Sequence, residues 1–169
     1  MSIESDLLRL ARDREAATDA AVDRMLLEAP DIVRRQLRAY LSRKVDCGRI
    51  ERTDEKIPQL MTLQGGFSQL SCPDVQFSSG ARLSFEIKLE EKQGGWLVRQ
   101  FQFHITLARS RTIKMVRFHL NAATRHDPLT IPRCHLHIDN SEAHVPLPVM
   151  DPLLMVHIIC EHVEPDFGT

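Results

Sequence analysis

The sequence lacks a CxxC pair, an internal repeat, a low-complexity tract and a hydrophobic run long enough to cross a membrane. Its four cysteines, at positions 47, 72, 134 and 160, are far apart in the chain, which excludes a zinc ribbon or a dithiol redox motif by spacing. We therefore expect reduced thiols that are mostly buried. The formal net charge is only -1, which excludes an overall polyelectrolyte such as a histone.

The first residues also lack the pattern of a signal peptide. Glu4 and Asp6 stand where positive charge is needed, and no apolar stretch precedes Arg9 and Arg12. We expect a cytoplasmic protein with no membrane association. A length of 169 residues, with 43% hydrophobic and 27% charged residues, predicts one folded domain over residues 1–169.

The first part of this domain, residues 1–60, is predicted to be helical. Helix formers run from about residue 3 to residue 27, and apolar residues recur three or four positions apart. The members of this stripe are Ile3, Leu7, Leu10, Ala17, Ala21 and Met25. Pro30 then interrupts the pattern, Asp31 is of the type that caps a second helix, and Cys47-Gly48 ends that helix.

The second part, residues 61–169, is predicted to be a sheet followed by a helix. From Leu63 onward polar and apolar residues alternate, and glycine-containing turns separate the runs. The predicted strands are 81–90 and 96–107 as a hairpin, then 113–120, 132–138 and 144–147. Asp151 and Pro152 are typical of the N-cap and first position of a C-terminal helix. The fold class is therefore α+β, with two N-terminal helices, an antiparallel meander of about five to six strands and a C-terminal helix on its apolar face.

Alternation within the strands predicts two faces of contrasting chemistry, because successive side chains of a strand point oppositely. The apolar face contains Phe101, Phe103, Ile105, Leu107, Val116, Phe118, Leu120, Cys134, Leu136 and Ile138. The other face contains four histidines and two arginines, namely His104, His119, His135, His137, Arg117 and Arg133. If the strands are neighbours, the imidazoles of His119, His135 and His137 are expected within about 10 Å of one another, two strand spacings.

Charge is unevenly distributed along the chain. Between Arg99 and His126 there are six Lys or Arg residues and no acid, whereas no Lys or Arg follows Asp139. The segment from Asp31 to Arg52 is also basic, and we expect it to extend the basic sheet surface. Such a surface attracts RNA, another polyanion or an acidic protein partner. The residues predicted to bind nucleic acid are Arg133, Arg99, Lys114, Arg34 and Arg38.

The histidine-rich face leads to a functional hypothesis, a metal-independent ribonuclease. Imidazoles of His119, His135 and His137 are suited to proton transfer near neutral pH, and Arg117 to stabilising a phosphate in the transition state. No cofactor is required, although His135 and His137 could hold a divalent metal together with His119 or His104. A polar face with a purely structural role, or a non-enzymatic adaptor for nucleic acid or an acidic protein, would also explain the pattern.

Two segments add a resemblance. The runs 118–126 (FHLNAATRH) and 131–137 (IPRCHLH) resemble the C-terminal half of TumE-type toxins of bacterial toxin-antitoxin systems. That resemblance covers about 70 residues and implies a cognate antitoxin as partner, with Asn121, His126, His135 and His137 at the matching positions. The chain departs from the pattern at Ala122-Ala123-Thr124-Arg125-His126 and at Pro132-Arg133-Cys134-His135, and helices precede its sheet.

Overall fold

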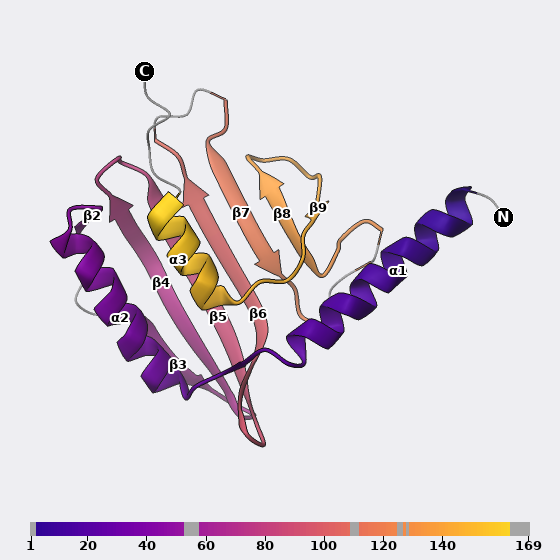
Figure 1. Ribbon diagram of the computed structural model, residues 1–169, viewed down its shortest axis with the longest axis horizontal. Coiled ribbons are helices and arrows are strands. Elements are labelled where there is room, and N and C mark those ends of the chain that lie inside the picture. The colour runs from indigo at the N-terminus through magenta and orange to yellow at the C-terminus, as the bar shows by residue number, and fades with distance from the viewer. Residues whose placement is uncertain (1–2, 53–57, 109–111, 125–126, 128, 163–169) are drawn as a thin grey trace.

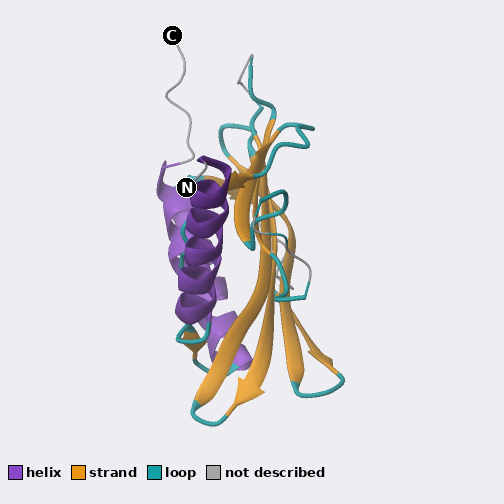
Figure 2. Cartoon of the chain, turned by 90° about the vertical axis from the view of Figure 1, so that its right-hand side faces the viewer, coloured by secondary structure: helices purple, strands orange, loops and turns teal. Residues whose placement is uncertain are grey.

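A computed structural model describes residues 3–52, 58–108, 112–124, 127 and 129–162. The chain folds as an antiparallel sheet with helices on one of its faces, which confirms the predicted α+β class (Figures 1 and 2). None of the helices found in the described ranges is long and apolar enough to cross a membrane.

Three helices and nine strands make up the described part of the chain. In chain order they are α1 Ile3–Val22, β1 Leu26–Leu27, α2 Pro30–Asp46, β2 Ile50–Arg52, β3 Gln59–Leu63, β4 Phe67–Phe77, β5 Arg82–Lys92, β6 Gly95–Thr106, β7 Met115–Leu120, β8 Cys134–Ile138, β9 Val145–Pro146 and α3 Pro152–His162. The sheet runs β2-β4-β5-β6-β7-β8-β9, with β3 also paired to β4 and β1 also paired to β6.

The sheet is larger than the predicted meander of five to six strands. The predicted hairpin and the three strands after it correspond to β5 to β9, whereas β1 to β4 had no predicted counterpart. In β4 the pairing with β5 shifts register between Cys72 and Val75, around Pro73. This irregularity breaks the period of two. The buried residues are Leu70 and Cys72 before it and Val75 and Phe77 after it, so the spacing between Cys72 and Val75 is three residues.

The apolar stripe predicted for the first helix is wrong. Leu7 and Leu10 are 58% and 59% exposed, and the helix ends at Val22 instead of near residue 27. The buried positions of α1 are Ala11, Glu15, Thr18 and Val22. This face is largely polar because Glu15 accepts from the backbone N–H of Arg133, just before β8, and Asp19 pairs with the Arg133 guanidinium. Only the last turn of α1 reaches the hydrophobic core.

The second helix packs on the sheet as an ordinary amphipathic helix. Val33, Leu37 and Leu41 of α2 are buried in the core. The helix begins at Pro30 with Ala29 at the N-cap, so the predicted capping role of Asp31 is wrong. Asp31 lies instead in the first turn, where its carboxylate pairs with Arg34.

The C-terminal helix packs on the apolar face, as predicted. The Asp151 carboxylate accepts hydrogen bonds from the backbone N–H groups of Leu153 and Leu154, which is the predicted N-cap. The residues of α3 that enter the core are Met155, Val156, Ile159 and Cys160. The opposite side of the helix is not covered by the described part of the chain, since Leu154 remains 48% exposed.

Candidate metal centre

The histidines lie on the sheet face opposite the helices, as the alternation of β6, β7 and β8 predicted. His119 of β7 is the register partner of His135 in β8, and Arg117 is the partner of His137. On the other side of β7, Arg117 is paired with His104 of β6. The predicted proximity of the three central histidines is confirmed, because their ring centroids are 4.9–5.3 Å apart.

Five rings form a continuous group, which we call the imidazole cluster: His104, His119, His135, His137 and His144. The sequence interpretation missed His144 as a site residue. It precedes β9, whose pairing of Val145 with Leu136 places it beside His137, with ring centroids 4.4 Å apart. The signal was present, because strands 132–138 and 144–147 around a short turn form a hairpin that brings these residues together.

Backbone carbonyls orient two of these rings. His135 Nδ1 is 2.5 Å from the carbonyl oxygen of Pro132, and His137 Nδ1 is 3.3 Å from that of Ser141. A carbonyl oxygen only accepts, so both Nδ1 atoms must carry the proton. In the neutral rings this leaves a lone pair on Nε2, the arrangement by which a second shell of protein groups presents histidine to a metal.

The nitrogen atoms of three rings converge. One ring nitrogen from each of His119, His135 and His137 lies within 4.8 Å of the other two, and His135 and His137 are buried. A tetrahedral ion with metal–nitrogen bonds of about 2.0–2.1 Å holds its ligands about 3.4 Å apart, so the ring nitrogens would approach one another on binding. His104 Nε2 is already 3.3 Å from His119 Nε2. A donor set made only of imidazoles suits Zn²⁺, Cu²⁺ or Ni²⁺ better than Mg²⁺ or Ca²⁺.

The environment of His104, His119, His135 and His137 keeps these four rings neutral. Burial, followed by the neighbouring His135 and His137, lowers the pKa of His119 to about 3. Burial also lowers the pKa of His135 to about 4, against the opposing effect of the Pro132 carbonyl. The pKa values of His104 and His137 are lowered as well, mainly by burial. At pH 7 these rings are therefore unprotonated, the form that binds metal and the wrong form for a general acid.

Arg117 lies among these neutral rings. Its Nη2 donates to the carbonyl oxygen of Asp139 at 2.9 Å, while its Nε is buried without a hydrogen-bond partner among the described residues. The Asp139 carboxylate is turned to the backbone, where it accepts from the N–H groups of Lys114 and Met115. The positive charge of Arg117 thus faces the imidazoles, and it contributes to the lowered pKa values of His104, His119 and His137.

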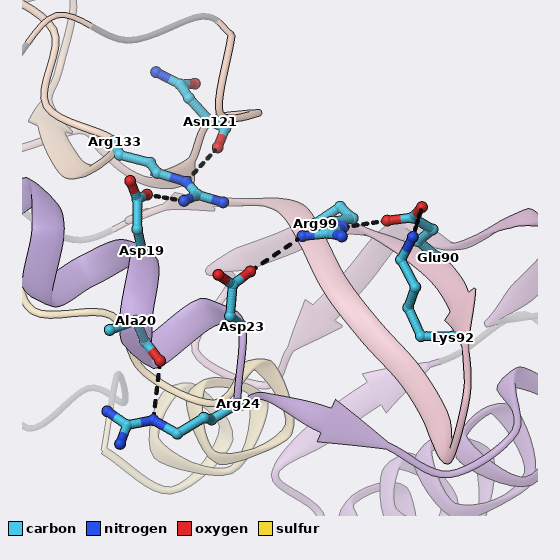
Figure 3. Close-up of polar contacts among 9 residues, drawn as sticks. All are labelled: Asp19, Ala20, Asp23, Arg24, Glu90, Lys92, Arg99, Asn121 and Arg133. Atoms are coloured by element: carbon cyan, nitrogen blue, oxygen red, sulfur yellow. Dashed lines mark hydrogen bonds and ion pairs between the residues drawn. The ribbon is translucent and has the colours of Figure 1, made fainter.

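Two arginines predicted to bind nucleic acid are paired with acidic side chains (Figure 3). The Arg133 side chain is 3% exposed, and it pairs with Asp19 of α1 and donates to the carbonyl oxygen of Asn121. Arg99 is skipped where the pairing of β5 and β6 shifts register, and it forms ion pairs with Glu90 and Asp23. Arg133 thus has no guanidinium surface to offer a phosphate.

The predicted continuity between the basic helix and the histidine face is wrong. Arg34 and Arg38 belong to α2, which lies in the helical layer on the apolar side of the sheet (Figure 2). Lys114 lies just before β7 and is exposed. Its backbone N–H donates to the carboxylate of Asp139, which places it next to the cluster. Of the basic run from Arg99 to His126, residues 109, 111 and 125 are not among those that the structure describes.

Asn121, a further position of the toxin-like pattern, is not part of the cluster. The backbone of Asn121 pairs with Arg133 at the edge of β7, and its side chain is half-buried. His126 lies outside the described residues.

The cysteines are free, as predicted, with Cys72, Cys134 and Cys160 buried and Cys47 exposed.

No protein-family model matches the chain, and searches of curated proteins and of solved structures found no match. The resemblance to TumE-type toxins is therefore tested by none of these comparisons and stays a prediction.

Proposed function

We propose that the protein binds a divalent transition-metal ion through His119, His135 and His137. The observation that carries this proposal is the convergence of three ring nitrogens within 4.8 Å. Two further features support it, the backbone acceptors that fix the Nδ1 protons of His135 and His137 and the burial that keeps the rings neutral. Three protein ligands leave a coordination position for a water or another ligand, as in catalytic zinc sites.

Calorimetric titration with Zn²⁺ tests the proposal directly. The full chain is prepared without a polyhistidine tag and treated with a chelator before titration. We expect one ion per chain for the unchanged protein. Replacing a residue that only supports a metal ligand can cost roughly 100-fold in metal affinity. For His137→Ala and His119→Gln, which remove a ligand itself, we expect a loss of Zn²⁺ affinity at least as large. Because the rings are already unprotonated, binding at pH 7 is expected to release few protons, which titration in buffers of different ionisation enthalpy measures.

A matched control is His162→Gln. This histidine is exposed at the end of α3 and lies on the helical side of the sheet, away from the cluster. Its replacement should leave Zn²⁺ affinity unchanged. Equal losses for His162→Gln and His137→Ala, or no stoichiometric binding by the unchanged protein, would contradict the metal site.

A metal-independent ribonuclease is a second candidate, favoured by the position of Arg117 between His104 and His137. It is the weaker of the two, because it needs one protonated imidazole near pH 7 and the pKa values of His119 and His135 lie far below that. The test is RNA cleavage at pH 6–8 in the presence of a chelator. Cleavage that His137→Ala abolishes would favour the ribonuclease, whereas salt-sensitive binding without cleavage would favour an adaptor for nucleic acid.

A further inference from the structure

Arg117, which lies beside the imidazole cluster, carries a positive charge that the three proposed metal ligands do not balance. The three convergent groups are neutral rings, and the metal-ligating group identified among the described residues includes no carboxylate or thiolate. A divalent ion there would add two positive charges to that of Arg117. The acids whose charges act on the cluster are engaged, since Glu86 accepts from the Gln102 amide and Glu15 accepts from the backbone N–H of Arg133. The Asp139 carboxylate accepts from backbone N–H groups.

Arg117 also has an unused donor at this place. Its Nε is buried and unpartnered within the described part of the chain, although Nη2 is satisfied by Asp139. In the strand register, Arg117 is paired with His104 on one side and with His137 on the other. His119 is two residues further along the same strand and points to the same face. An anionic acceptor bound beside the metal would satisfy this N–H and balance the local charge at once.

Part of the cluster is accessible beside Arg117. His104, Arg117 and His119 are half-buried, as is His144 next to β9, whereas His135 and His137 in β8 are buried. A small ligand can therefore approach over β6 and β7. It would meet the metal and the guanidinium group together.

We propose that the metal-loaded cluster takes a small oxyanion as its further ligand, with one oxygen on the metal and another accepting from Arg117. This inference rests on the proposed metal site and names the class of molecule that the site recognises. A phosphate group and a carboxylate share the required chemistry, and both are tested below. A fourth imidazole ligand, from His104 or His144, is the arrangement that would exclude such an anion.

The test uses the full chain loaded with one equivalent of Co²⁺, whose visible absorption reports its coordination. Inorganic phosphate and acetate are titrated separately at constant ionic strength, with perchlorate as the reference salt. We expect a saturable change of the Co²⁺ spectrum with at least one of the two anions and none with perchlorate. For phosphate, paramagnetic broadening of the ³¹P resonance would show that the anion lies beside the metal.

Arg117→Gln and Arg117→Lys separate the role of this residue from that of the metal. We expect Arg117→Gln to weaken anion binding at least tenfold while Co²⁺ affinity is kept or increased, and Arg117→Lys to restore part of the loss. Arg82→Gln, on the same sheet face but paired with Asp74 outside the cluster, should change neither. Circular dichroism verifies that each variant is folded, and the lysine variant keeps the test decisive if Arg117→Gln does not fold.

Each outcome decides a different point. Co²⁺ binding with a spectrum that neither anion alters would overturn the oxyanion inference and leave the metal site intact. Equal anion affinity in Arg117→Gln and the unchanged protein would overturn the role of Arg117. Failure to bind Co²⁺ at all would contradict the proposed metal site itself.

Discussion

The two faces of the central strands differ in chemistry although they share one backbone. In β6, Phe103 points to the helices and is fully buried between Phe85 and Phe101, whereas the next residue, His104, points to the other side and contacts His119. The helical face is buried and closely packed, and its side chains need only shape and hydrophobicity. The histidine face holds polar groups that are partly desolvated without being packed under a helix. One face thus stabilises the fold, and the other is free to carry a site.

The strongest test of this comparison replaces adjacent residues of β6. We expect Phe103→Ala to lower the free energy of unfolding by about 3–5 kcal/mol, because it leaves a cavity between Phe85 and Phe101. His104→Ala should lower it by less than about 1 kcal/mol, as for surface positions. Urea denaturation of chelator-treated protein measures both. Similar costs for the two variants would show that the histidine face contributes to stability as much as the core.

The α1 helix is an exception, because charged groups attach it to the sheet. The backbone N–H of Arg133 donates to the buried carboxylate of Glu15, and the Arg133 guanidinium pairs with Asp19 (Figure 3). We expect Asp19→Ala to cost about 1–3 kcal/mol, since it leaves a buried guanidinium short of an acceptor. The control is Asp23→Ala in the turn after α1, whose contact with Arg99 is largely exposed and should cost less than about 1 kcal/mol. A larger effect for Asp23→Ala would contradict this account of how α1 is held.

Local alternation made the sheet faces predictable. A period of two is a property of neighbouring residues, so the two sides of β6, β7 and β8 could be assigned without knowing the pairing, and His119, His135 and His137 followed. The N-cap at Asp151 was predictable for the same reason. Strands as short as β1 carry no periodicity, and the irregular pairing near Pro73 hid the period of β4.

Other features depend on contacts between distant parts of the chain. Arg133 was expected on the histidine face, but its partner Asp19 is 114 positions away in the sequence and removes it from solvent. The exposure of Leu7 and Leu10 depends on where α1 lies against the sheet, which its own stripe does not specify. Arg34 and Arg38 were misplaced for a related reason, since composition shows that a segment is basic but not on which side of the sheet it packs.

The histidine face should also reveal itself through pH. In chelator-treated protein the pKa values of His119 and His135 are about 3 and 4, below the roughly 6.5 of an unfolded chain. Unfolding therefore takes up protons as the pH falls below about 6.5, and the free energy of unfolding decreases until the pH passes below the folded pKa values. Urea melts between pH 7 and pH 5 measure this proton uptake. We expect His119→Asn to reduce it by up to about one proton, whereas an unchanged slope would mean that His119 is solvated like a surface histidine.

The smallest effect is expected for an ion pair on the histidine face that lies outside the cluster. Arg82 and Asp74 form two hydrogen bonds, at 2.9 and 2.5 Å, yet their side chains are 60% and 43% exposed. Water screens such a pair, and ordering two mobile side chains offsets much of the attraction. We expect Asp74→Asn to move the thermal midpoint by less than about 2 °C, as measured by circular dichroism at pH 7. The arginine lowers the pKa of Asp74, so even this small contribution should disappear as the pH falls and the carboxylate protonates. A loss of stability as large as that of Phe103→Ala would mean that polar contacts on this face hold the sheet together. The conclusion that the helical face alone stabilises the fold would then be wrong.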